Sequence, residues 1–493
     1  MTEHTVMIVG AGPTGLMLAG ELSLAGVDVA IVELRASQHL LGSRAGGLHA
    51  RTIEALDQRG IANRFLSQGQ KYPVVHFNRV ALDISDFPTR HNYVLGLRQN
   101  HIERLLAEWV AELRVPIYRN HEVTGFTQND TGIELSVVDG QRFRAEYLVG
   151  CDGGRSVIRK SAGIEFAGSD ATTSWLIAEV QTAAEPKWGF TEDARGRHAI
   201  GRGDGGQVGI VLMEAHLQLG SEPTLRDVSE ALVAIYGTDY GIHSPTWISR
   251  FTDMTRQATT YRAQRVLLAG DAAHVHPPMG GQGLNIGVQD AVNLGWKLAQ
   301  VIKRKSSESL LDTYHAERFP IGARVLRNTM AQVALSRRDD RTQALAEIVA
   351  EFLKLDEPRK QLAAEISGLG IRYDCEHTNL NSKHPLLGRR MPDLDLINAD
   401  GPLRTFRLLH HARPVLLNLD DSATLDIAGW ADRVELINAK YEGSWELPAV
   451  GAVAAPSAVL IRPDGYVAWV GEHHTVGLTE ALSTWFGAPA HTA

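Results

Sequence analysis

Residues 5–33 read TVMIVGAGPTGLMLAGELSLAGVDVAIVE, and this stretch decides the fold of the first part of the chain. The β-branched run at its start predicts a buried strand, and apolar residues recur at helical spacing after Gly15. A second apolar run follows Gly26 and ends at Glu33. A strand, a glycine turn, a helix, a second strand and a terminal acid in this order predict a βαβ unit that binds a dinucleotide.

Each glycine of the turn has its own expected role. Gly10 permits the tight turn, Gly12 lets the backbone approach a pyrophosphate, and Gly15 lets the helix pack on the strand. The helix N-terminus offers free N–H groups to the phosphates, and Glu33 can accept a hydrogen bond from a ribose hydroxyl. The motif alone does not separate FAD from NAD, and a purely structural glycine turn is the alternative. The predicted cofactor-binding residues are Gly10, Gly12, Pro13, Thr14, Gly15, Glu33, Leu34 and Arg35.

The composition of the 493 residues is that of a globular protein with two or three domains. The formal net charge of −8 is spread without long runs of one sign, so neither nucleic acid nor a membrane surface is an expected partner. The only two cysteines, Cys151 and Cys375, exclude a disulfide framework and indicate a reducing compartment. The sequence has no pattern of a signal peptide or membrane span, so we expect a cytoplasmic protein.

Two later stretches each place an acid and small residues after an apolar strand. The first is AEYLVG at 145–150, followed by Asp152 and Gly153, and the second is QRVLLA at 264–269, followed by Gly270 and Asp271. A carboxylate at such a strand end suits hydrogen bonding to the hydroxyls of a ribose or ribityl chain. Together with the first motif, these stretches favour one FAD site built from three separated parts of the chain.

The last of these stretches continues into PPMGGQGLN at 277–285, which opens a long predicted helix. The bare N–H groups of that helix end would face an electron-rich ligand edge, such as the flavin pyrimidine carbonyl. Gln282 and Asn285 have an alternative role, because either side chain could simply cap the helix. The candidate cofactor contacts are Pro278, Gly281, Gly283, Leu284 and Asn285.

These motifs resemble those of the class A, single-component FAD-dependent aromatic hydroxylases of the para-hydroxybenzoate hydroxylase type. Asp152 and Gly153 match the family's DG motif, which is associated with both FAD and NADPH. Gly270 and Asp271 match its GD motif, in which Asp271 would hold the ribityl chain. The resemblance covers nearly the whole chain.

Further stretches are similar to the aromatic polyketide hydroxylases and rifampicin monooxygenases within that family. By this resemblance, Arg44 and Gln99 would lie against the FAD. Arg51 and Arg59 fit helix-face ion pairs better than ligand contacts. The stretches are SRAGGLHARTIE at 43–54, YVLG at 93–96 with Gln99, YHAER at 314–318 and HPLLGRRMP at 384–392.

Between the two halves of the FAD domain, short apolar strands predict an antiparallel sheet, which the resemblance makes the substrate floor. The candidate substrate contacts are Trp175, Met213 and Phe251, and core packing is an equally open role for each. The glycine- and arginine-containing residues 195–201 are expected to form a mobile loop over the flavin.

The last part of the chain, after about Pro385, is similar to the thioredoxin-like tail of polyketide and phenol hydroxylases. No Cys-x-x-Cys motif is present, so the tail is expected to be structural or interfacial. The predicted fold class is α/β, with a Rossmann-like FAD-binding domain, an antiparallel-sheet substrate domain and a thioredoxin-like C-terminal domain. The expected boundaries are 1–166 and 264–380 for the two parts of the FAD domain, 167–263 for the sheet, and 385–493 for the tail.

No metal site is expected, because neither the pair His274 and His276 nor the pair His473 and His474 has a third ligand in view. No acid or base stands out, so the catalytic residues are unassigned. No second complete dinucleotide unit occurs in the sequence. The co-substrate, NADPH or NADH, would therefore dock without a Rossmann domain of its own, as in class A enzymes.

The resemblance implies that NADPH or NADH reduces the FAD, that O2 adds at flavin C4a, and that the resulting hydroperoxide hydroxylates an electron-rich ring. The implied substrate is a large polycyclic phenol or naphthoquinone of antibiotic biosynthesis. Inactivation of a rifamycin-type drug by the same chemistry is the first alternative. The alternative of another class is a redox-silent FAD-containing protein that binds an aromatic compound. The expected partners are small aromatic molecules, and a homodimer is compatible with the sequence.

Replacement of Gly12 by valine is expected to give protein without FAD, because a side chain there blocks the approach of the pyrophosphate. The measurement is the ratio of flavin to protein absorbance after purification. A normal FAD content in Gly12→Val would argue against the N-terminal cofactor assignment.

Overall fold

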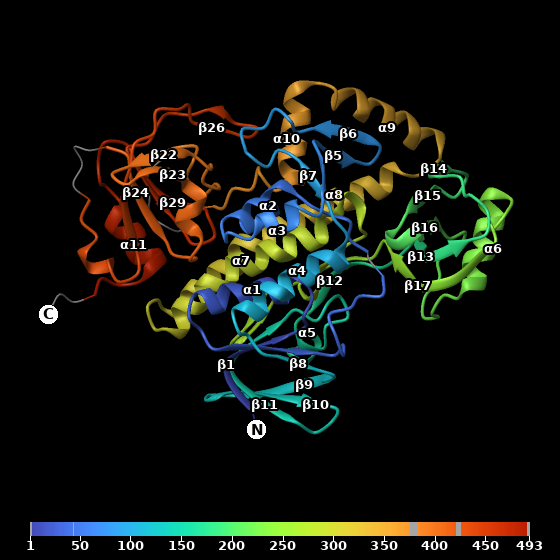
Figure 1. The fold of residues 1–493 in the computed structure, drawn as a ribbon, viewed down its shortest axis with the longest axis horizontal. Coiled ribbons are helices and arrows are strands. Elements are labelled where there is room, and N and C mark those ends of the chain that lie inside the picture. The colour runs from blue at the N-terminus through green and yellow to red at the C-terminus, as the bar shows by residue number, and fades with distance from the viewer. Residues whose placement is uncertain (1, 43, 375–382, 421–424, 491–493) are drawn as a thin grey trace.

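The computed structural model of the protein describes residues 2–42, 44–374, 383–420 and 425–490. Ser43 and Cys375, which the sequence analysis used, lie outside these ranges. Figure 1 shows an elongated molecule, with the predicted FAD domain in the middle, the C-terminal domain at one end and an antiparallel sheet at the other.

The central domain is built on an eight-stranded sheet whose main path runs β19-β20-β11-β1-β2-β8. All pairs from β20 to β8 are parallel, and Val9, Gly150 and Leu268 lie side by side at one edge. The carboxyl ends of neighbouring parallel strands meet at the same edge, so the three predicted motifs follow three adjacent strands. The strands are β1 Thr2–Val9, β2 Val29–Glu33, β8 Ile117–Arg119, β9 Val123–Asn129, β10 Gly132–Val137, β11 Arg142–Gly150, β19 Arg262–Ala263 and β20 Val266–Leu268.

Two helices, α1 Pro13–Leu24 and α7 Gln282–Ile302, lie side by side across the middle of the molecule (Figure 1). Glycine permits this close packing, because a Cβ atom at Gly287 would lie 2.4 Å from Thr14 Oγ1. A Cβ atom at Gly270 would also contact Thr14, at 2.6 Å. The first turns of both helices therefore lie near the end of β20.

Smaller elements surround this core. None of the helices in the described ranges is both long and apolar enough to cross a membrane. The remaining helices are α2 Ala50–Asp57, α3 Ala62–Leu66, α4 Gln99–Glu112, α5 Val157–Ser161, α8 Asp312–Leu335, α9 Asp340–Phe352 and α10 Asp356–Ser367. The remaining short strands are β3 Gly47–Leu48, β4 Gln70–Tyr72, β5 Val74–Phe77, β6 Val80–Asp83, β7 Val94–Gly96, β12 Phe166–Ser169, β18 Thr255–Ala258, β21 His274–Val275, β22 Asp395–Asn398, β23 Gly401–Arg404, β26 Glu446–Leu447 and β27 Gly451–Ala452.

The middle domain is a five-stranded antiparallel sheet in the order β14-β15-β16-β13-β17. Leu176, Ala178 and Val180 of β13 pack with α6 on one face, so the alternate residues of that strand face the other way. The prediction of a mobile loop at residues 195–201 is wrong, because most of these residues belong to strand β15, which pairs with β14 and β16. The elements are β13 Ser174–Thr182, β14 Gly189–Glu192, β15 Arg197–Arg202, β16 Val208–Met213, α6 Leu225–Tyr236 and β17 Ile242–Thr252.

The C-terminal domain holds a four-stranded sheet in the order β25-β24-β28-β29. Strands β24 and β25 are parallel, whereas β28 pairs antiparallel with both β24 and β29. The likeness of this domain to thioredoxin stays a prediction. The elements are β24 Val415–Asn418, β25 Glu435–Asn438, β28 Ala458–Ile461, β29 Val467–Gly471 and α11 Leu478–Phe486.

A buried ion pair joins the central and C-terminal domains. The guanidinium of Arg59 contacts both carboxylate oxygens of Glu21 on α1, at 2.6 and 2.8 Å, and neither side chain is exposed. Arg59 also donates hydrogen bonds to the backbone carbonyls of Leu409 and Pro463. Arg51 likewise pairs with Glu54 and donates to the Asp464 carbonyl. Arg51 thus forms an ion pair within α2, whereas Arg59 lies beyond the end of α2 and forms a buried pair with α1 rather than the expected helix-face pair.

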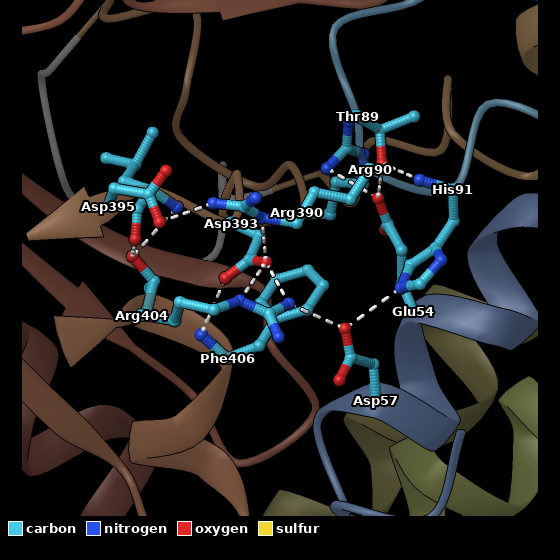
Figure 2. A network of polar contacts seen from close by, with 12 residues as sticks. Glu54, Asp57, Thr89, Arg90, His91, Arg390, Asp393, Asp395, Arg404 and Phe406 are labelled. Atoms are coloured by element: carbon cyan, nitrogen blue, oxygen red, sulfur yellow. Dashed lines mark hydrogen bonds and ion pairs between the residues drawn. The ribbon is translucent and has the colours of Figure 1, made fainter. Parts of the chain in front are cut away.

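A second polar layer lies at the same interface (Figure 2). Asp57 at the end of α2 accepts a hydrogen bond from Arg404 at 2.7 Å and contacts the His91 ring at 2.9 Å. Burial raises the pKa of Asp57, but these two contacts outweigh burial and hold the pKa below its ordinary value. Arg404 also pairs with Asp393 of the C-terminal domain. The two domains are thus fastened by fixed charges rather than by apolar packing alone.

Arg59→Leu is expected to lower the free energy of unfolding by about 3–5 kcal/mol, because it leaves the Glu21 carboxylate buried without a partner. The control is Arg64→Leu, which removes an Arg–Glu pair of similar geometry with Glu112 whose side chains are 35 % and 56 % exposed. The control should cost roughly 0–1 kcal/mol. Unfolding midpoints in denaturant provide the comparison. Equal losses in the two variants would contradict the interface role of Arg59.

Candidate functional site

The three predicted motifs converge at the carboxyl edge of the parallel strands. A Cβ atom at Gly10 would lie 2.4 Å from the carbonyl oxygen of Cys151, so no side chain fits between the first and second motifs. Arg159 joins the second and third motifs, because it donates hydrogen bonds to the carbonyls of Gly154 and Ala272 at 3.0 and 2.8 Å. One continuous site is therefore built from parts of the chain that lie far apart in sequence.

The space in front of α1 suits a pyrophosphate. Gly12 precedes the helix, and no side chain caps its first N–H groups. A Cβ atom at Gly12 or at Gly153 would meet no protein atom of the described ranges within 4 Å. The open space, the free N–H groups and the positive end of the helix dipole fit the phosphates of a dinucleotide.

Glu33 is held firmly at the end of β2. Its two carboxylate oxygens accept hydrogen bonds from the N–H groups of Ala11 and Arg35, at 2.5 and 2.8 Å. The Arg35 guanidinium also pairs with Glu33 and with Glu103. Leu34 between them is exposed. The carboxylate is oriented for a further acceptor role, so its predicted bond to a ribose hydroxyl stays a prediction.

Asp271 and the start of α7 form the opposite side of the site. Asp271 is exposed, and no hydrogen-bond donor within the described ranges contacts its carboxylate. A Cβ atom at Gly283 would lie 3.8 Å from Asp271 Oδ1. Gly280 and Gly281 have φ angles of 71° and 64°, which favour glycine, and no side chain caps α7. A free carboxylate beside free N–H groups fits the ribityl hydroxyls and the electron-rich edge of a flavin.

Asn285 contacts the backbone around the start of α7 but does not cap the helix, so its predicted contact with the cofactor stays a prediction. Its amide accepts a hydrogen bond from the His49 N–H at 2.7 Å and donates to the Gly281 carbonyl at 2.8 Å. The side chain therefore closes the backbone around the helix start. Gln282 is buried beside it. Pro278 is exposed and Leu284 is partly buried at the same turn, so direct contact of these two with a cofactor stays a prediction.

Asp290 is a supporting residue that sequence reasoning missed. Its carboxylate accepts hydrogen bonds from the Gly270 N–H and the His274 ring, and it pairs with Arg318 at 2.7 Å. Burial raises the pKa of Asp290, but Arg318 and His274 outweigh burial and hold it below its ordinary value. The signal available in the sequence was that Asp290 is the single acid in the predicted helix after Gly283. No cluster that could hold a metal ion occurs within the described ranges.

The loop around Arg44 connects this site to the middle sheet. Arg44 donates a hydrogen bond to Ser249 Oγ on β17 at 2.8 Å, and its guanidinium lies 6.0 Å from the centre of the Trp247 ring. Gln99 accepts from the Ala45 N–H at 3.4 Å. Gln99 also donates to Glu103, the partner of Arg35. Arg44 and Gln99 thus lie between the predicted FAD site and the sheet.

A cavity of about 270 Å³ lies between that loop and the sheet. Ile177 and Glu179 of β13 are on the strand face opposite α6, and Val211 of β16 lies directly across from Ile177. A Cβ atom at Gly46 or Gly201 would meet no described atom within 4 Å, so these glycines keep the cavity open. The lining residues are Arg44, Ala45, Gly46, Arg98, Ile177, Ala178, Glu179, Ala199, Gly201, Arg202, Gly209, Ile210 and Val211.

The three predicted substrate contacts lie on the same face of the middle sheet, beside Ile177 and Val211. Trp175 lies opposite Met213 on one side and Phe251 on the other. The Trp175 and Phe251 rings are stacked at 5.3 Å with an angle of 7°, and Trp175 is only 4 % exposed. None of the three lines the cavity. Substrate contact by these three residues stays a prediction.

Comparison with known proteins agrees with this architecture. The FAD binding domain family matches residues 3–329, and the C-terminal domain family of aromatic-ring hydroxylases matches residues 384–489. A rifampicin monooxygenase from Streptomyces venezuelae is 42 % identical, over 98 % of each chain. The structure of the anhydrotetracycline hydroxylase OxyS from Streptomyces rimosus has a TM-score of 0.90 and 42 % identity, over 99 % of this chain and 100 % of that one. A dialkyldecalin synthase from Streptomyces rugosporus is 34 % identical, over 99 % of this chain and 100 % of its own.

Asp271→Ala is expected to weaken FAD binding roughly 10- to 100-fold, because the ribityl hydroxyls lose a charged acceptor. Asp271→Asn keeps an acceptor oxygen and should retain more FAD than the alanine variant. Flavin content and the dissociation constant, from the quenching of flavin fluorescence, provide the measurement. An alanine variant that retains the FAD content of the wild type would contradict this assignment.

Proposed function

Because this chain belongs to the family of FAD-dependent aromatic-ring hydroxylases, which are monooxygenases, we propose that it hydroxylates a large polyketide-type phenol or naphthoquinone. The electrons come from NADPH or NADH, and the oxygen atom comes from O2. The observation that carries the substrate proposal is the cavity between the Arg44 loop and the middle sheet. A partly apolar space beside the Arg44 loop suits an aromatic ring system.

FAD, when bound, supplies the redox chemistry, since it accepts electrons from the nicotinamide and activates O2. The residues of the chain bind and orient. The free N–H groups at the start of α1 would hold the phosphates. The free N–H groups at the start of α7 would stabilise negative charge at the flavin edge. Asp271 holds the ribityl chain. Ile177 and Val211 support the aromatic ring of the substrate and exclude water from one of its faces.

Two alternatives follow from specific likenesses. The likeness to rifampicin monooxygenase favours inactivation of a rifamycin-type drug, in which the same site would act on a naphthohydroquinone. The relative from Streptomyces rugosporus is named as a synthase and not as an oxygenase. A relative over the whole chain is therefore named for something other than oxygenation, and this keeps open the candidate of another class, a redox-silent FAD protein that binds an aromatic compound. A homodimer is also proposed, and it is compatible with each of these functions.

The test is oxidation of NADPH and NADH by the purified yellow protein with tetracyclic phenols, naphthoquinones and rifampicin. Oxygen uptake and product mass are recorded together. We expect one compound class to stimulate oxidation and to yield a product heavier by one oxygen atom. The monooxygenase proposal fails under three conditions that must hold together. Dithionite reduces the bound FAD, so the flavin is competent, yet no compound stimulates oxidation of NADPH or NADH. In addition, a compound that binds, as shown by a change in the flavin spectrum, is recovered without an added oxygen atom.

A further inference from the structure

Glu179 is the only carboxylate among the described residues that line the cavity. It lies on β13, and its Oε1 atom is 2.6 Å from Nη1 of Arg98, the residue that precedes α4. The two side chains are 14 % and 27 % exposed. The pair therefore spans the junction between the middle sheet and the FAD domain, in the wall of the space assigned to the substrate.

Glycines on the neighbouring strands make room beside this pair. Glu179 lies opposite Gly209, and Gly209 lies opposite Gly201 on the next strand. A Cβ atom at Gly209 would lie 3.6 Å from Nη2 of Arg98, so the guanidinium covers that glycine. A Cβ atom at Gly201 would meet nothing within 4 Å among the described atoms. The free space thus continues directly past the ion pair.

The second oxygen of Glu179 remains available. Arg98 engages Oε1, and no donor in the described part of the chain forms a hydrogen bond with Oε2. Oε2 is not among the buried side-chain atoms of the described residues, so it is accessible, and Glu179 lines the cavity. A carboxylate fixed through one oxygen and open at the other is an acceptor of defined direction.

We propose that Glu179 determines specificity, accepting a hydrogen bond from a hydroxyl group of the aromatic substrate while Arg98 fixes its orientation. The hydroxyl is phenolic or enolic and carries its proton, because the free carboxylate oxygen accepts a hydrogen bond only from a group that has a proton to donate. The ring lies over Ile177 and Val211, which face each other on adjacent strands of the same sheet face. This inference rests on the proposed function, since it places an aromatic substrate in the cavity.

A purely structural pair would behave differently from a recognition pair. A structural pair would hold the sheet against the FAD domain, and its loss would weaken binding of every ligand equally. A recognition pair distinguishes a compound with a hydroxyl from the same compound without one. The decisive comparison is therefore a phenol against its own O-methyl ether, which keeps the ring and the oxygen but has no proton to donate.

The experiment measures dissociation constants of both compounds for the oxidised, FAD-loaded protein from changes in the flavin spectrum. The wild type should bind the phenol roughly 10- to 100-fold more tightly than the ether. Glu179→Leu should abolish this preference. Glu179→Gln should abolish most of it too, because Arg98 occupies the amide carbonyl and turns the NH2 group, a donor, toward the cavity. If the leucine variant folds poorly, the glutamine variant still tests the proposal, because glutamine keeps the size and polarity of the side chain.

The matched control is Glu192→Gln. Glu192 also lies on the middle sheet and pairs with an arginine, Arg338, at 2.7 Å, but it does not line the cavity. This variant should keep the wild-type preference. The inference is overturned if Glu179→Gln keeps the preference, or if both Glu179 variants weaken phenol and ether equally.

Binding to the oxidised protein separates this inference from the proposed function. A wild type that prefers the phenol but adds no oxygen to it would refute the monooxygenase proposal and leave the role of Glu179 supported. A wild type that hydroxylates the phenol and its ether with equal KM, and binds them equally, would support the enzyme and overturn the role of Glu179.

Discussion

The buried carboxylate of Asp290 is the contact on which the second half of the cofactor site depends. It holds the Gly270 N–H, the His274 ring and the Arg318 guanidinium at 3.1, 2.7 and 2.7 Å. The turn that carries Asp271 is therefore fixed to α7 and α8 at once. A buried network of this kind favours one geometry, because an arrangement that separates Asp290 from Arg318 leaves a buried charge without its partner.

The C-terminal domain extends this support, although it supplies none of the predicted FAD contacts. Arg318 donates a hydrogen bond to the Tyr373 hydroxyl at 3.0 Å, and the Tyr373 ring lies 4.3 Å from the ring of Tyr466 in the C-terminal domain. The adjacent residue of α8, Glu317, pairs with Lys297 of α7 and Arg462 of the C-terminal sheet. Burial raises the pKa of Glu317, but the two cations outweigh burial and hold it at about 2. A tail without a redox motif thus has a physical role, since it holds the helices that carry the cofactor site.

The sequence predicted the parts of the site that depend on local patterns. The turn at Gly10 and the acid Asp271 follow strands that can be recognised from a few residues, and parallel strands bring their ends together. The partners of Asp290, and the pairing of Arg98 with Glu179 across 81 positions, arise only from tertiary packing. The interpretation of 195–201 as a loop failed for a related reason, because β15 is a strand through its pairing with β14 and β16, and the local residue pattern does not show that pairing.

The most direct test of the whole account is the origin of the added oxygen. The FAD-loaded protein is supplied with NADPH and with the aromatic compound that most stimulates its oxidation, under an atmosphere of isotopically heavy O2. The account predicts a product that carries one heavy oxygen atom, and an unlabelled product oxygen when only the water is heavy. A product whose added oxygen comes from water, or a product with no added oxygen, would contradict it.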